Sequence, residues 1–226
     1  SSDLSEADFA AYPARTALAL LSRIRRAVRE DARAGLPWQA ALDNVRRDGP
    51  AIWAALPPGE KARLVRRLRV WWDIHRFRIA PQVEAVMGRL IAEGRLRIVA
   101  RHLLSANLGD QGIEITSRGR DRQTRHEVFD AVILTTGPAH GEILSGSAFL
   151  SSLAEAGLIR ADALQLGLDV TEGCRAVGVD GTPVPGLFVA GPLARGHIGE
   201  LMGIPEVTAH AELVAARLAQ TLAAPV

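Results

Sequence analysis

The chain has 226 residues, a formal net charge of +2 and 48% hydrophobic residues, enough apolar material for the packed core of one or two domains. Its single cysteine, Cys174, excludes an intrachain disulfide and a thiolate metal cluster and favours a cytoplasmic location. No apolar run approaches the roughly 18–20 residues that span a bilayer, and the N-terminus lacks a basic region followed by an apolar core. We therefore expect no membrane partner and no secretory leader.

Charge is distributed unevenly along the chain. Residues 1–126 hold 23 Lys or Arg against 14 Asp or Glu, whereas residues 127–226 hold 4 against 11. The arginines of the first part are spread among acids on amphipathic patterns, with no basic run or tail, which disfavours a nucleic-acid partner. The opposite charges predict that the two parts attract each other.

Helical periodicity dominates from residue 14 to about residue 93. Two apolar stripes carry it, formed by Leu18, Leu21, Ile24 and Val28 and by Leu64, Leu68, Trp71 and His75. Gly and Pro break the pattern at residues 35–37, 48–50 and 57–59, and Pro81 suits the first turn of a helix that ends near Gly94. The pattern predicts four or five helices within a helical region of residues 1–94.

From Arg95 the hydrophobic period changes to two, which predicts a β-meander over residues 95–130. Residues 131–138 show no alternation and predict a strand buried on both faces, as in a parallel sheet. A short helix is expected at residues 149–157, strands at 166–170 and 188–190, and a closing helix at 207–218. The expected fold class is mixed α/β, with residues 131–226 as the third region.

Three stretches of the chain resemble one family. Residues 132–138 resemble the strand end that follows a three-stranded meander in FAD/NAD(P)-binding oxidoreductases. Residues 164–196 are similar to the C-terminal part of the bacterial FAD/NAD(P)-binding proteins related to YdhS. Residues 71–81 resemble the W-D-x-H-R-x-R-x-A-P element of that family. The matches occur in the family's order, so the chain resembles the distal part of a flavoprotein with two dinucleotide-binding folds.

The resemblance implies a flavin-dependent, NAD(P)H-using oxidoreductase or monooxygenase-like parent with FAD and a small-molecule substrate. Such a fold opens with a G-x-G-x-x-G phosphate turn, yet no G-x-G occurs in this chain. We therefore expect a C-terminal fragment that is inactive alone, binds FAD weakly or not at all, and has the N-terminal nucleotide-binding part as a partner. The alternative is a non-catalytic interaction module with an arginine-rich helical surface.

The cofactor-binding residues that follow from the resemblance lie at two strand ends and one helix start. The start of a helix offers unpaired N–H groups to the negative charge of a reduced flavin. Relatives have Asp at the position of Pro192, which has neither a carboxylate nor an N–H. The structural alternatives are a strand end with small residues and a loop that packs a terminal helix. The expected set is Thr135, Thr136, Gly137, Pro138, Gly191, Pro192, Leu193, Gly196, Ile204, Glu206 and Val207.

A second candidate site concentrates charged and aromatic side chains within seven residues, Trp72, Asp73, His75, Arg76 and Arg78. Bidentate arginine contacts there would bind an anionic or planar substrate, or the pyrophosphate of a nicotinamide cofactor. The alternative is a structural ion-pair network. No catalytic base is assigned, and the six histidines show no metal-ligand spacing, so no metal is expected.

Overall fold

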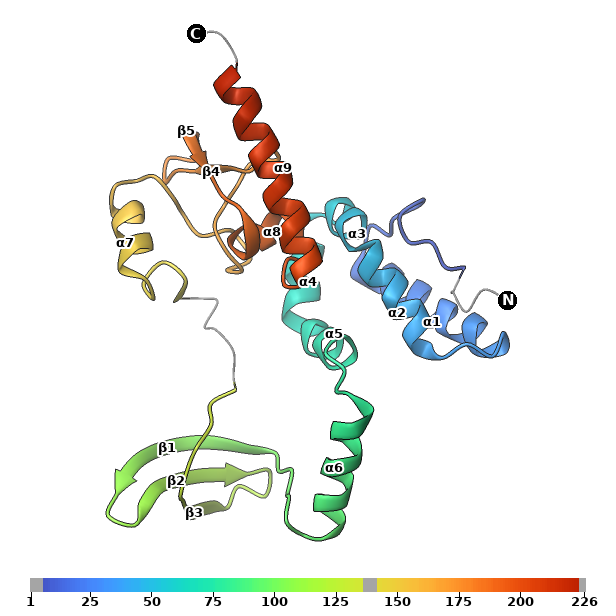
Figure 1. The fold of residues 1–226 in the computed structure, drawn as a ribbon, viewed down its shortest axis with the longest axis vertical. Coiled ribbons are helices and arrows are strands. Elements are labelled where there is room, and N and C mark those ends of the chain that lie inside the picture. Colours follow the sequence, from blue (N-terminus) through green and yellow to red (C-terminus); the bar gives the residue numbers. More distant parts are fainter. Residues whose placement is uncertain (1–5, 136–141, 224–226) are drawn as a thin grey trace. The chain divides into compact units, whose positions relative to one another are not determined.

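The computed structural model describes residues 6–135 and 142–223 and divides the chain into two compact units (Figure 1). The larger unit combines Ser1–Phe77 with Ala139–Val226, and the smaller unit is Arg78–Pro138. The predicted regions 1–94, 95–130 and 131–226 follow secondary structure along the chain, whereas these units follow contacts in space. The mixed α/β class is confirmed.

Five helices precede Phe77, and their ends follow the Gly and Pro signals. Thr16 caps the first helix by accepting the N–H of Ala19 at 3.1 Å, and Gly35, with a φ of +78°, follows its end, as a helix terminus favours. Pro58 occupies the first position of the fourth helix. The helices are α1 (Ala17–Arg33), α2 (Trp38–Arg47), α3 (Gly49–Ala55), α4 (Pro58–Arg67) and α5 (Arg69–Arg76).

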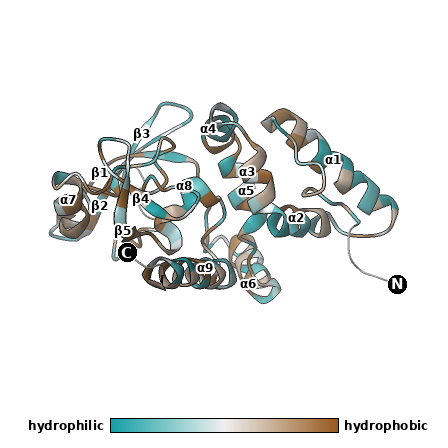
Figure 2. Cartoon of the chain, turned by 90° about the horizontal axis from the view of Figure 1, so that it is seen from above, coloured by the Kyte–Doolittle hydropathy of each residue, from teal (hydrophilic) through white to brown (hydrophobic). Residues whose placement is uncertain are grey.

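The helical part has an apolar core of its own. Its buried side chains come from the N-terminal segment and from the first three helices, namely Phe9, Leu20, Ala27, Ala41, Val45, Ile52 and Leu56. Hydrophilic and hydrophobic residues alternate along α1 and α2 (Figure 2), as expected for helices that bury one face.

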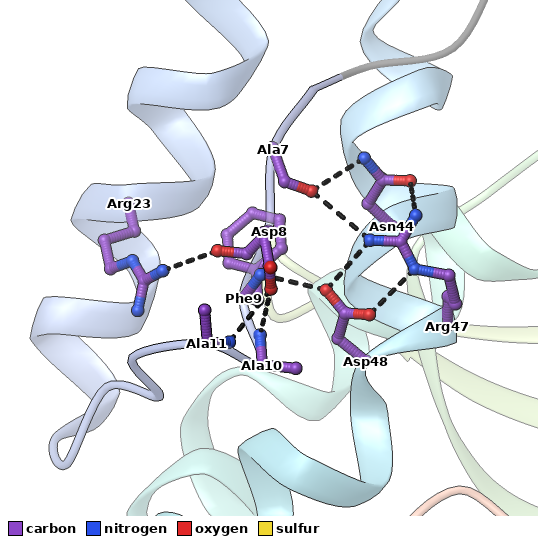
Figure 3. Close-up of polar contacts among 9 residues, drawn as sticks. All are labelled: Ala7, Asp8, Phe9, Ala10, Ala11, Arg23, Asn44, Arg47 and Asp48. Atoms are coloured by element: carbon purple, nitrogen blue, oxygen red, sulfur yellow. Dashed lines mark hydrogen bonds and ion pairs between the residues drawn. The ribbon is translucent and has the colours of Figure 1, made fainter.

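The segment before α1 is held onto α2 by polar contacts (Figure 3). The N–H of Phe9 donates to Oδ2 of Asp48 at 2.9 Å, and Nε of Arg47 donates to Oδ1 of the same carboxylate at 2.8 Å. Nδ2 of Asn44 donates to the carbonyl of Ala7 at 2.9 Å. Asp48 is 8% exposed, so its carboxylate needs these donors.

Replacing Asp48 with Asn should lower the free energy of unfolding by about 1–2 kcal/mol at neutral pH, because charge-assisted bonds are lost. The bond from Arg47 lowers the pKa of Asp48 below its ordinary 3.8; burial opposes this, and the N–H of Phe9 adds to the lowering. A lowered folded-state pKa means that the stabilisation exists above pH 3.8 and is lost as the pH falls below it. Urea unfolding of both proteins across the acid range checks this, and a difference that does not shrink in acid would contradict it.

The second part of the larger unit is built around the hairpin of β4 (Arg175–Val177) and β5 (Pro183–Phe188), which pair antiparallel. Its core contains Ile159, Leu168, Val170, Ala176, Val189 and Leu201. The remaining elements are α7 (Ala148–Glu155), the 3₁₀ helix η2 (Gly191–Ala194), α8 (Arg195–Ile198) and α9 (Ile204–Ala223). The predicted short helix and closing helix are confirmed.

The smaller unit contains α6 (Pro81–Ala92) and the predicted meander, β1 (Arg101–Gly109), β2 (Gly112–Gly119) and β3 (Thr124–Phe129). The strands pair antiparallel in the order β1-β2-β3. The first strand begins at Arg101 and not at Arg95. The reason is local: Gly94 has a φ of +71°, and the N–H groups of Arg95 and Leu96 close onto the carbonyl of Leu90, so these residues end the helix.

The prediction of a buried strand at residues 131–138 is wrong for its described part, residues 131–135. These residues form no strand, and Ile133 and Leu134 are 84% and 77% exposed. A strand buried on both faces needs neighbours on each side, and the described sheet of this unit is the meander alone. The expected strand at 166–170 is also wrong: Leu168 and Val170 are buried but make only isolated bridges, to Ala161 and Ala176. A strand was expected at 188–190, but the observed strand, β5, ends at Phe188.

Candidate functional site

The turn after β5 is fixed to α9 by a buried histidine. Gly191 is buried with a φ of +77°, and its N–H donates to Nδ1 of His210 at 3.0 Å. An acceptor at Nδ1 places the ring proton on Nε2, which lies 3.4 Å from Sγ of Cys174. Burial, then the positive charge of Arg217 and the neighbouring His197, lower the pKa of His210. The neutral imidazole therefore holds the turn against the helix.

The other predicted residues of the turn have packing partners of their own. The carbonyl of Leu193 accepts the N–H of Leu168 at 2.8 Å. A Cβ at Gly196 would lie 2.7 Å from Oδ1 of Asp162, a side chain that is 6% exposed. Pro192 is exposed. The turn therefore exposes Pro192, while its glycines allow close approach of the chain.

The start of α9 already carries a carboxylate. Glu206 lies in the first turn of the helix, its Oε2 packs over Gly203, and its Oε1 accepts two bonds from Arg46, at 3.0 and 2.7 Å. Burial raises the pKa of Glu206, but its own backbone N–H and Arg46 outweigh burial, so the pKa lies below its ordinary value. Its neighbour Ile204 is 84% exposed, whereas Val207 is partly buried.

A cavity of about 880 Å³ lies within the larger unit, between α1 to α5 and the segment around α8. All four tryptophans of the chain line it, Trp38, Trp53, Trp71 and Trp72, and we call it the tryptophan cavity. Its remaining walls are mainly leucine, isoleucine and valine side chains. Five arginines and two acids also line it, Arg25, Arg29, Arg46, Arg69, Arg195, Asp73 and Glu200.

Trp53 joins the helices to the turn on one side of this cavity. Its Nε1 donates to the carbonyl of Gly196 at 3.0 Å. Gly199 has a φ of +98°, and a Cβ there would lie 2.9 Å from Cγ of Trp53. Residue 199 must therefore be glycine for two reasons: its φ is positive, and there is no room for a Cβ beside Trp53.

The structure brings only part of the second predicted site together. Trp72, Asp73 and His75 line the tryptophan cavity, and Nε1 of Trp72 donates to Oε2 of Glu200 at 3.3 Å. Arg76 does not line the cavity, but its guanidinium lies 3.7 Å from Oε1 of Glu200. Arg78 is exposed and belongs to the smaller unit.

Of the four cofactor-binding residues predicted at residues 135–138, the structure describes only Thr135. This residue belongs to the smaller unit and is exposed. Thr136, Gly137 and Pro138 lie outside the described residues. Within residues 6–135 and 142–223, no group of three His, Cys, Asp or Glu side chains is placed to hold a metal ion. In the same ranges, no helix is both long and apolar enough to cross a membrane.

Sequence reasoning missed several residues of the cavity, including Trp38, Trp53, Arg69, Arg195 and Glu200. They lie on four helices and a loop and have no common spacing. Composition is the one feature of the sequence that could have indicated the tryptophans. Only 4% of the residues are aromatic, yet all four tryptophans lie between residues 38 and 72, within the helical region where the cavity forms.

The fold of this chain is shared with part of one larger solved structure. No family model and no curated protein matches the sequence. Among solved structures, the reduced form of ornithine hydroxylase (PvdA) from Pseudomonas aeruginosa matches with a TM-score of 0.52 and 19% identity, covering 80% of this chain and 42% of the hydroxylase. The chain thus spans less than half the length of this neighbour. The match shows a shared fold and does not support the narrower YdhS-like family.

Proposed function

We propose that the chain is the C-terminal part of a flavin-dependent, NAD(P)H-using oxidoreductase or monooxygenase-like protein related to the YdhS family. The observation that carries the proposal is the fold shared over 80% of the chain with a hydroxylase described in its reduced form, which is a redox state. The β5–turn–α9 arrangement, at which the resemblance places the flavin, supports it.

The flavin contact falls mainly on the turn. Pro192 is exposed and Leu193 is partly exposed, so a planar cofactor can lie against the turn at these two residues. Gly191 and Gly196 are buried and keep the turn close to His210 and Asp162. At the start of α9, Ile204 and Val207 offer apolar contact, and Arg46 holds the carboxylate of Glu206. FAD supplies the redox chemistry when bound, and these residues position it.

The exposed apolar residues 131–135 support a missing partner. Val132, Ile133 and Leu134 are 40%, 84% and 77% exposed, and side chains of this type are found inside parallel sheets. We propose that the N-terminal nucleotide-binding part covers this run and supplies the phosphate turn. Thr135, the last described residue of this run, would then lie beside that part and its cofactor.

The full-length protein should purify yellow with flavin absorbance, whereas the 226-residue chain should bind FAD weakly or not at all. The pyrophosphate site needs the strand–turn–helix that this sequence lacks. Absorbance spectra and equilibrium dialysis with FAD check both forms. A colourless full-length protein that does not take up FAD would favour the interaction module, and stoichiometric FAD on the 226-residue chain would defeat the expectation of a fragment.

A further inference from the structure

We propose that the tryptophan cavity binds a small organic anion with a large apolar body, and that Arg69 and Arg195 hold the anionic group. This inference goes beyond the flavin proposal and does not depend on it, because the cavity lies in one compact unit and binding can be measured without a cofactor.

The cavity suits an apolar body by size and by lining. Its volume of about 880 Å³ falls in the range of about 300–1,000 Å³ that is typical of small-molecule sites. Trp53 is 8% exposed, whereas Trp38 and Trp71 are 38% and 62% exposed, so the indoles extend from the interior to the opening. Rigid indole faces and aliphatic side chains bind apolar surface at low entropic cost, and releasing water from such walls favours binding.

The charge of the lining favours an anion. Each acid of the lining already has an arginine beside it: Oδ2 of Asp73 lies 3.5 Å from Nε of Arg69, and Oε1 of Glu200 lies 3.7 Å from Arg76. Five arginines line the cavity against these two acids, and one of the five, Arg46, pairs with Glu206 outside the lining. Arginines still outnumber these three acids. The wall is therefore positively charged.

Two of these arginines repel each other. Burial, followed by the positive charge of Arg69, lowers the pKa of Arg195, although Glu200, Asp73 and Asp162 partly offset this. Both guanidiniums line the same cavity. A carboxylate, sulfonate or phosphate between them would relieve the repulsion and accept charge-assisted bonds from both planar groups.

A cation is the competing occupant, since indole rings attract positive charge. Lys61 shows this within the same fold, with Nζ 5.3 Å from the ring centroid of Trp53. The experiment must therefore compare ligands that share one apolar body and differ only in charge. The probes are 1-pyrenebutyrate, 1-pyrenebutanol and 1-pyrenebutylamine, titrated into the 226-residue chain.

Energy transfer from tryptophan to pyrene measures binding, and all four donors line the cavity. We expect the carboxylate to bind about tenfold more tightly than the alcohol, the strength of one charge-assisted bond, and the amine to bind most weakly. Equal affinities, preference for the amine, or no transfer with any probe would each overturn the proposal.

Arginine variants locate the anionic group. Arg195→Gln and Arg69→Gln should each weaken pyrenebutyrate about tenfold and leave pyrenebutanol unchanged. Arg66→Gln is the matched control, because Arg66 is an exposed residue of α4 outside the lining. If either variant fails to fold, the Lys variant at the same residue, Arg195→Lys or Arg69→Lys, retains the charge without the planar fork and should give an intermediate loss. Affinity for the carboxylate that survives in both Gln variants would refute the assignment.

Discussion

Gly167→Ala should destabilise the larger unit by about 3 kcal/mol or more, because a new methyl group would collide with backbone. A Cβ at Gly167 would overlap the carbonyl oxygen of Leu193 and lie 2.9 Å from its carbonyl carbon. That oxygen accepts the N–H of Leu168, so it cannot move away without breaking this bond. The atoms that a Cβ at Gly167 would meet all belong to the backbone of Leu193, so no flexible side chain can move aside to make room.

Urea unfolding followed by far-UV circular dichroism measures the effect, with Gly173→Ala as the matched control. A Cβ at Gly173 meets only Oγ1 of Thr171, at 3.5 Å, an ordinary contact, so this variant should change the free energy of unfolding by less than about 0.5 kcal/mol. Equal unfolding midpoints for the two variants would show that the Gly167–Leu193 approach is not a constraint in solution.

The elements that sequence predicted correctly are those that neighbouring residues determine. Pro58 and Pro81 begin helices, Gly35 and Gly94 follow helix ends, and Gly109 to Gly112 turn β1 into β2. The strand prediction for residues 131–135 was wrong because it depended on contacts with distant parts of the chain. The apolar composition of these residues reports a preference for burial, whereas a strand also needs neighbours, which no local pattern supplies.

The residues of the tryptophan cavity also divide into those that local spacing predicts and those that only the packing of distant segments brings together. The stripe that contains Trp71 and His75 follows from helical spacing, and the structure places both on the tryptophan cavity. Trp53 and Arg195 are 142 positions apart, yet both line this cavity. Their meeting depends on the packing of α3 against α8, which a single sequence does not reveal.

Arg76→Met should destabilise the protein by about 2–3 kcal/mol, because it leaves Glu200 partly buried without its cation. The side chains of Arg76 and Glu200 are 15% and 14% exposed, and the bond from Trp72 alone does not neutralise the carboxylate. Methionine replaces the apolar stem of arginine as far as Nε, so the packing of this stem changes little. Chemical denaturation measures the difference.

Two comparisons separate a structural role of Arg76 from a binding role. Arg78→Met should change stability by less than about 0.5 kcal/mol, because Arg78 is exposed and surface substitutions cost little. Adding Glu200→Gln to Arg76→Met should recover part of the lost stability, because it removes the charge that has lost its partner. If Arg76→Met instead folds with unchanged stability and only pyrenebutyrate affinity falls, Arg76 serves the ligand and not the fold.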